Sequence, residues 1–179
     1  MAQFQGKTAN PLVFNMMESG HRFGGRQRGG YVKIKIAWIG KTREPACAAL
    51  TEEYLKRISR YAEVEGISLR SEADLLEKFG QNQKGGTKCS VVLMDSRGKE
   101  FTSEQFAKFL GDYQERNPLP LVFAIGGADG FTSETRVAAQ SMISLGKMTL
   151  AHELARIVLL EQLYRAFTIL KGHPYHSGH

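Results

Sequence analysis

Two segments of the chain are apolar at almost every position over the length of a β-strand, and they constrain the fold more than any other feature. They are SVVLMD (Ser90–Asp95) and PLVFAIGG (Pro120–Gly127). A helical stretch that runs to about Tyr113 separates them, and Thr102 and Gln105 open it with the spacing of a capping box. Strands that are apolar throughout are typical of parallel sheets covered on both faces. The pattern therefore predicts an α/β fold.

The rest of the chain from Val32 onward alternates strands and helices in the same way. We predict strands over residues 32–38, 66–70 and 142–145, and helices over residues 44–61, 72–79, from about 133, and over residues 151–170. Such alternation predicts a parallel sheet with helices on both faces, in one domain that spans residues 32–179.

Residues 1–31 are expected to lie outside this domain. They show neither the two-residue period of a strand nor the period of about 3.6 residues of a helix. The segment SGHRFGGRQRGG is rich in glycine and arginine, which favours disorder. One alternative is an RNA-binding arm, and another is a mis-assigned start, with Val32 as the true first residue.

Charge and composition limit the classes of partner that the protein can bind. The formal net charge is +6, and residues 1–30 contribute half of it, with four basic residues against Glu18. The folded part is thus mildly basic, which is compatible with RNA. No apolar run approaches a membrane span, no signal peptide is recognisable, and Cys47 and Cys89 show no paired-motif spacing. We expect a cytoplasmic protein with no membrane partner.

Ligands of parallel α/β sheets bind at the carboxyl ends of the strands. Three segments follow such ends, namely Met94–Lys99, Ile125–Gly130 and Leu145–Leu150, and two of them are glycine-rich. Glycine lets a ligand approach the backbone, which predicts a cofactor-type site, although a plain tight turn would also explain the glycines. Neither a Walker loop nor GxGxxG spacing is present, which argues against nucleoside triphosphates and dinucleotides.

The last helix is apolar around most of its circumference, so that it is either fully buried or packed against a second chain. We favour a homodimer. Within this helix Glu161 and Arg165 stand four residues apart. They form either a structural ion pair or a pair in which Glu161 orients Arg165 toward an anionic substrate.

Three of the five histidines lie in the last nine residues, KGHPYHSGH. A zinc site would normally include a supporting carboxylate or cysteine, which this tail lacks, so we predict no metal. A metal-dependent hydrolase is the competing interpretation, and metal analysis would reveal it.

The run LGKMTLAHELARIVLLEQLYRAFTILKGHPYH, preceded by FAIGGADG and LMDSRGK, resembles the RlmH family of SPOUT-class methyltransferases over residues 32–176. The resemblance implies an α/β knot, with a C-terminal trefoil knot, and a homodimer whose site is completed across the interface. It also implies a reaction in which S-adenosylmethionine methylates N3 of a pseudouridine. That nucleotide would lie in the helix 69 loop of 23S ribosomal RNA, within assembled ribosomes.

The resemblance also implies roles for individual residues. Cofactor contacts fall on Met94, Gly127, Gly146, Lys147, Met148, Thr149, Leu150 and Ala151. The residues that would surround the target base are His152, Arg165, His173, Tyr175 and His176. For His152, a purely structural role is the alternative. The chain departs from the family pattern at Gly146, Ala151 and Ser177, and residues 70–88 form a shorter segment than usual.

Methylation of N3 requires the loss of its proton. We expect Arg165 to stabilise the charge that develops on the base, and Tyr175 or a tail histidine to receive the proton. The alternatives are a SPOUT methyltransferase for another RNA such as transfer RNA, and a non-catalytic RNA-binding protein. Stabilisation by S-adenosylmethionine would separate the enzyme from the binding protein.

Overall fold

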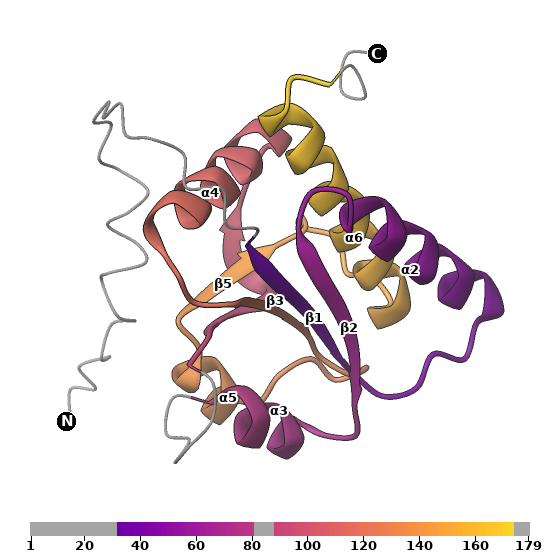
Figure 1. Cartoon of the computed structure of the whole chain (residues 1–179). Helices are drawn as coiled ribbons and strands as arrows, with labels where there is room; N and C mark the ends of the chain where they lie inside the picture. The colour runs from indigo at the N-terminus through magenta and orange to yellow at the C-terminus, as the bar shows by residue number, and fades with distance from the viewer. Residues whose placement is uncertain (1–31, 81–87, 174–179) are drawn as a thin grey trace.

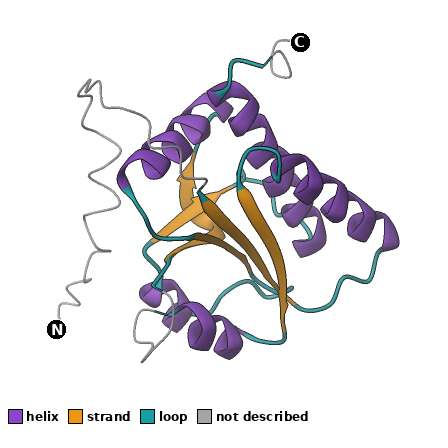
Figure 2. Cartoon of the chain, viewed as in Figure 1, coloured by secondary structure: helices purple, strands orange, loops and turns teal. Residues whose placement is uncertain are grey.

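The computed structural model describes residues 32–80 and 88–173, and these form a parallel sheet between two layers of helices (Figures 1 and 2). The strands are β1 (Lys33–Ile39), β2 (Glu63–Leu69), β3 (Ser90–Glu100), β4 (Leu121–Ile125) and β5 (Ser141–Ser144). The helices are α2 (Pro45–Ile58), α3 (Glu72–Phe79), α4 (Ser103–Arg116), α5 (Ser133–Ala138) and α6 (His152–Leu170). The sheet order is β2-β1-β4-β3-β5, and every pairing is parallel. The predicted α/β class is therefore confirmed.

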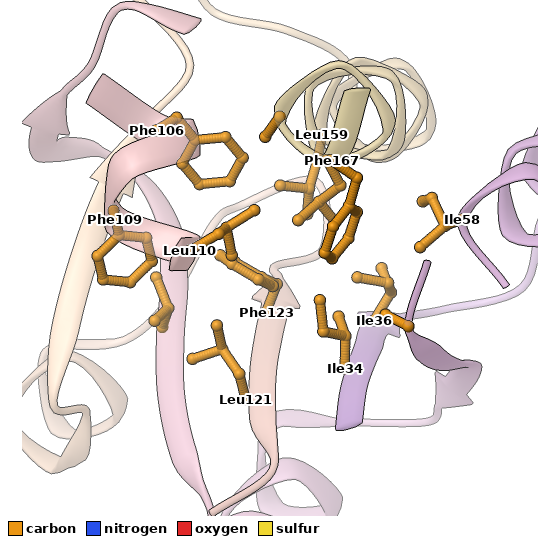
Figure 3. Packing of buried hydrophobic residues seen from close by; sticks show 14 of the residues in the cluster. Ile34, Ile36, Ile58, Phe106, Phe109, Leu110, Leu121, Phe123, Leu159 and Phe167 are labelled. Carbon is orange, nitrogen blue, oxygen red and sulfur yellow. The ribbon is translucent and has the colours of Figure 1, made fainter. Parts of the chain in front are cut away.

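Each face of the sheet is covered by its own helices (Figure 1). On one face, Ile34 and Phe123 pack in a core with side chains of α4 and α6, such as Leu110 and Phe167 (Figure 3). On the other face, Ala37 packs in a second core with side chains that include Phe79 of α3. Neighbouring residues of a strand point to opposite faces, so continuous apolar strands supply both cores. Among the described residues, no helix is long and apolar enough to cross a membrane.

The helix starts follow the capping signals of the sequence. At α4, Thr102 Oγ1 accepts a hydrogen bond from Gln105 N–H at 3.2 Å, and Gln105 Oε1 accepts one from Thr102 N–H at 2.9 Å. The predicted capping box is confirmed. Helix α3 covers the predicted residues, Glu72–Phe79, with Ser71 as its N-cap.

Strand β3 is longer than predicted. The expected strand ended at Asp95 and the following residues were expected to form a loop, but the strand continues to Glu100. Its register breaks between Met94 and Lys99, so that both residues pair with Ile143 of β5. Gly98 makes this possible, because a Cβ there would lie 2.5 Å from the backbone N of Ile143. The two strand backbones can approach this closely only at a glycine.

Candidate functional site

The predicted cofactor residues gather at one edge of the sheet. Strand β3 lies between β4 and β5, and Met94 is in register with both Ile125 and Ile143. Gly127 follows β4, and the segment from Gly146 to Ala151 follows β5. All three predicted segments therefore lie at the carboxyl edge of three neighbouring strands, where ligands of such sheets bind.

The GGADG segment after β4 is a tight turn. Gly127 and Gly130 form an isolated bridge, and Gly130 N–H donates to the Gly127 carbonyl at 3.1 Å. Gly130 has a positive φ of 72°, and a Cβ on Gly126 would lie 2.8 Å from the backbone of Gly130. Gly127 differs, because a Cβ there would meet only Ile39, at 3.8 Å. The turn therefore requires two of its glycines, whereas the third has room for a Cβ in ordinary contact with Ile39.

The segment between β5 and α6 exposes backbone at the same edge. Ser144 Oγ donates to the Gly146 carbonyl at 2.9 Å and accepts from Gly146 N–H at 3.1 Å. Lys147, Met148 and Thr149 are exposed, and 84% of Met148 is accessible. Ala151 is the N-cap of α6 and makes no side-chain capping bond. Residues 147–149 are therefore within reach of a ligand at this edge.

An ion pair links the end of the apolar part of β3 to α5, the helix that follows β4. Asp95, next to Met94, accepts a hydrogen bond from Arg136 Nε of α5 at 2.8 Å, and its side chain is 5% exposed. Burial raises the pKa of the Asp95 carboxyl, but hydrogen bonds from Arg97 N–H and Arg136 outweigh this and hold the pKa below its ordinary value. Asp95 thereby fixes α5, which follows the GGADG turn, against β3.

This ion pair predicts a pH dependence of stability. Because the folded pKa of Asp95 lies below the unfolded one, its contribution is complete above the unfolded pKa and is lost as pH falls through the folded pKa. We expect Asp95→Asn to lower the melting temperature at pH 7, and the difference from wild type to shrink as pH falls below about 4. Melting curves between pH 7 and pH 2.5 measure this, and a difference that is constant with pH would contradict it.

Glu153 connects α6 to the segment that follows β1. Its carboxylate accepts hydrogen bonds from the backbone N–H groups of Arg43 at 2.8 Å and Glu44 at 3.2 Å. The bond from Arg43 lowers the pKa of Glu153, against an opposing effect of burial, and the bond from Glu44 lowers it further. His152 Nε2 lies 3.9 Å from the same carboxylate, and the side chain of His152 is 31% exposed. His152 therefore lies at the edge predicted for the cofactor.

Arg165 lies farther along α6 and forms the predicted ion pair. Glu161 Oε1 accepts hydrogen bonds from Arg165 Nε at 3.0 Å and Nη2 at 2.8 Å. Both side chains remain partly exposed, at 26% for Arg165 and 21% for Glu161. This geometry fits a structural pair and also fits a carboxylate that orients a guanidinium toward a ligand.

His173 lies beyond the far end of α6. Its Nδ1 is 2.9 Å from the hydroxyl of Tyr61, and its backbone N–H donates to the Thr168 carbonyl at 2.9 Å. The last turn of α6, in yellow, lies far from the β1–α2 connection (Figure 1). Tyr175 and His176 lie outside the described residues. One chain thus brings the predicted cofactor residues and His152 together, but places Arg165 and His173 toward the opposite end of α6.

The sequence interpretation missed Glu153, Asp95 and Arg136 as residues that shape this edge. A signal existed for two of them, since Asp95 ends a buried strand and Glu153 occupies the first turn of α6. Their partners, Arg136 and the backbone of Arg43, are 41 and 110 positions away in the chain. No local pattern connects groups so far apart.

Comparison with known sequences gives consistent matches. Residues 32–176 match a family described as "Predicted SPOUT methyltransferase". A protein of Koribacter versatilis named ribosomal RNA large subunit methyltransferase H is 53% identical over 148 residues, which are 83% of this chain and all of that protein. A protein of the same name from Geobacter sp. strain M21 is 43% identical over 155 residues, with 81% and 99% of the two chains covered.

A solved structure shares the fold at low sequence identity. It is titled as a probable methylase family protein from Haemophilus influenzae Rd KW20 and superposes with a TM-score of 0.53 at 11% identity. The match covers 80% of this chain and 70% of that one. At this level of identity the likeness supports the arrangement of strands and helices alone.

Proposed function

We propose that this chain, which belongs to the RlmH family of SPOUT methyltransferases, transfers a methyl group from S-adenosylmethionine to large-subunit ribosomal RNA. We further propose N3 of a pseudouridine in the helix 69 loop, within assembled ribosomes in the cytoplasm, as the acceptor. The observation that supports a cofactor site in this chain is the meeting of Met94, Gly127 and the Gly146–Ala151 segment at one edge of the sheet. The relatives' names support the RNA substrate.

The residues at this edge fit S-adenosylmethionine. Among the described residues, a Cβ on Gly127 would contact only Ile39 and a Cβ on Gly146 would contact nothing, so a ligand can approach the backbone closely at both glycines, and residues 147–149 are exposed beside them. Met94, Gly127, Gly146, Lys147, Met148, Thr149, Leu150 and Ala151 would hold the cofactor. When bound, it supplies a methyl group activated by a sulfonium.

Gly127 offers a direct test of the cofactor site. Its φ is not in the left-handed region and its Cβ would meet only Ile39, at an ordinary contact distance, so Gly127→Val should fold with little change in melting temperature. The valine side chain would occupy space proposed for the cofactor, and we expect S-adenosylmethionine to bind at least about 10-fold more weakly, a difference of about 1.4 kcal/mol. Isothermal titration calorimetry of wild type and variant measures this, with Gly127→Ala as an intermediate case. Equal affinities would contradict the site.

Residues of the chain would stabilise the charge that develops on the base and accept the proton that leaves N3. N3 of the base becomes nucleophilic as its proton leaves, so negative charge develops on the base. Arg165, held by Glu161, would stabilise that charge, because a fixed guanidinium is a preorganised cation. Tyr175, His173 or His176 would receive or relay the proton. His152 lies at the cofactor edge, where it would contact the base or support Glu153.

The distance along α6 favours a site shared by two subunits. Arg165 lies about 20 Å along the helix axis from His152, at roughly 1.5 Å of rise per residue. The same chain therefore does not bring Arg165 to the methyl group, whereas a second copy packed against this one can. Leu154 of α6 and Leu50 of α2 are 52% and 45% exposed, as expected for apolar side chains that a partner covers. We propose a homodimer in which each cofactor edge receives α6 and the tail of the partner subunit.

A further inference from the structure

The segment that connects β1 to α2, residues 40–44, adjoins the proposed cofactor edge. Strand β1 pairs with β4, with Trp38 in register with Ile125, so both strands end at the same edge. The side chain of Ile39 lies 3.8 Å from the Cβ position of Gly127. At its other end, the segment is bound to Glu153 in the first turn of α6. It therefore runs from the GGADG turn to the start of α6.

Hydrogen bonds fix this segment at both ends. Gly40 N–H donates to the Leu69 carbonyl at 2.8 Å, and Ser68 Oγ donates to the Gly40 carbonyl at 2.9 Å. Gly40 has a φ of 95°, a conformation that favours glycine. The Glu153 carboxylate holds the N–H groups of Arg43 and Glu44, as described above. The segment is thus preorganised, and a ligand that binds it does not have to order its backbone.

The held backbone presents two cations to solvent. Lys41 and Arg43 are exposed, and within residues 32–80 and 88–173 neither side chain forms an ion pair. Strand β1, which precedes this segment, also carries two lysines, but both are paired. Lys33 forms an ion pair with Glu63 and Lys35 with Glu65, each at 3.2 Å. The carboxylate of Glu44 faces the start of α2, where it accepts from Ala46 N–H at 3.4 Å. The positive charge of Lys41 and Arg43 is therefore available to an anionic partner.

We propose that Lys41 and Arg43 bind phosphates of the substrate RNA next to the nucleotide that is methylated. This inference rests on the proposed function, since it places RNA at the cofactor edge. A base that reaches a methyl donor at this edge brings its own and its neighbours' phosphates within reach of the rim of the site. Lysine and arginine on a fixed backbone are suited to such contacts, which position the nucleic acid and carry no sequence information themselves.

The test compares two double variants that each remove two positive charges. Lys41→Ala/Arg43→Ala removes the proposed contacts, and Lys33→Ala/Lys78→Ala removes charges elsewhere, at the start of β1 and the end of α3. Binding of a large-subunit RNA fragment is followed by fluorescence anisotropy at several salt concentrations, and methylation is measured with the same RNA or with ribosomes. Calorimetry with S-adenosylmethionine checks the cofactor site in every variant.

We expect Lys41→Ala/Arg43→Ala to weaken RNA binding and raise KM by about 10-fold or more, with unchanged kcat and unchanged cofactor affinity. The slope of log K against log salt should become shallower by about 1.4–1.8, or about 0.7–0.9 for each lost phosphate contact. The control should match wild type in all five quantities. RNA affinity and salt slope equal to those of the control would overturn the proposal. RNA binding that shows the expected loss while the wild type transfers no methyl group would support these contacts and refute the proposed reaction.

Discussion

Arg165→Ala is expected to lower kcat for RNA methylation by about 100- to 1,000-fold, the range found when one preorganised charge-stabilising group is removed. Cofactor affinity should change little, because Arg165 is proposed to contact the target base of the RNA and not the cofactor. The melting temperature should change little, since a partly exposed ion pair four residues apart contributes only about 0.3–0.5 kcal/mol. Single-turnover methylation, calorimetry and thermal unfolding measure the three quantities.

The outcome separates the two interpretations of the Glu161–Arg165 pair. If the pair is only structural, Arg165→Ala leaves kcat unchanged, and the proposed role is lost. Arg70→Ala is the matched control, because Arg70 also pairs with an acid four residues away, Asp74 of α3, but is 94% exposed. Arg165→Lys should recover little of the rate, because an ammonium lacks the planar fork that Glu161 holds in two hydrogen bonds.

A mixing experiment tests whether the site is shared between subunits. At a cofactor concentration too low to saturate Gly127→Val, the Gly127→Val and Arg165→Ala homodimers should each have low activity, one because it binds the cofactor weakly and the other because it lacks the cation. After subunit exchange, a mixed dimer contains one edge with an intact Gly127 that faces an intact Arg165 of the partner subunit. Random exchange should therefore restore about a quarter of the wild-type activity. No recovery, with exchange shown by mass spectrometry, would contradict the shared site.

Gly98→Ala is expected to be the most destabilising single change outside the apolar cores. Its Cβ would lie 2.5 Å from the backbone N of Ile143 and 2.6 Å from the carbonyl carbon of Met142. Backbone atoms cannot turn aside as the end of a flexible side chain can, so β3 and β5 would have to separate. We expect a loss of about 3 kcal/mol or more in the free energy of unfolding, since overpacking against a fixed backbone exceeds ordinary core strain.

Thermal unfolding measures this effect. At about 2–4 °C for each kcal/mol in a chain of this size, the melting temperature should fall by about 6–12 °C. Gly127→Ala is the control, because its Cβ meets only Ile39 at 3.8 Å, and its melting temperature should stay at the wild-type value. A Gly98→Ala protein as stable as this control would show that β3 does not pack against β5 in this way.

Local signals in the sequence suffice for the order of elements in this fold. The apolar part of β3, strand β4, the capping box of α4 and the bounds of α3 agree with the sequence predictions, because each depends on residues that are neighbours in the chain. The resemblance to SPOUT methyltransferases added the α/β knot, and the family match confirms that class. The continuation of β3 past Asp95 was not predicted, because it depends on the contact between Gly98 and β5.

In the candidate site, too, local patterns predict some features, whereas features that depend on long-range contacts cannot be predicted from the sequence. Rules for parallel sheets placed Met94, Gly127 and Gly146 at one edge, and the structure places them there. The clamp of Glu153 on the Arg43 backbone could not be predicted, because it joins residues 110 positions apart. The roles proposed for Arg165 and His173 require the proposed second subunit, and no contact among the described residues of one chain brings either residue to the cofactor edge. They stay predictions, as do the roles of Tyr175 and His176.

The most direct test of the proposed reaction supplies the protein with methyl-labelled S-adenosylmethionine and ribosomes from a strain that lacks this activity. The RNA is then separated and the modified nucleotide is located by mass spectrometry. We predict one labelled methyl group per large-subunit RNA, on N3 of a pseudouridine in the helix 69 loop, and a clearly lower rate of labelling with the Gly127→Val protein at the same limiting cofactor concentration. Label on transfer RNA alone, or no label from a protein that binds the cofactor, would contradict the account.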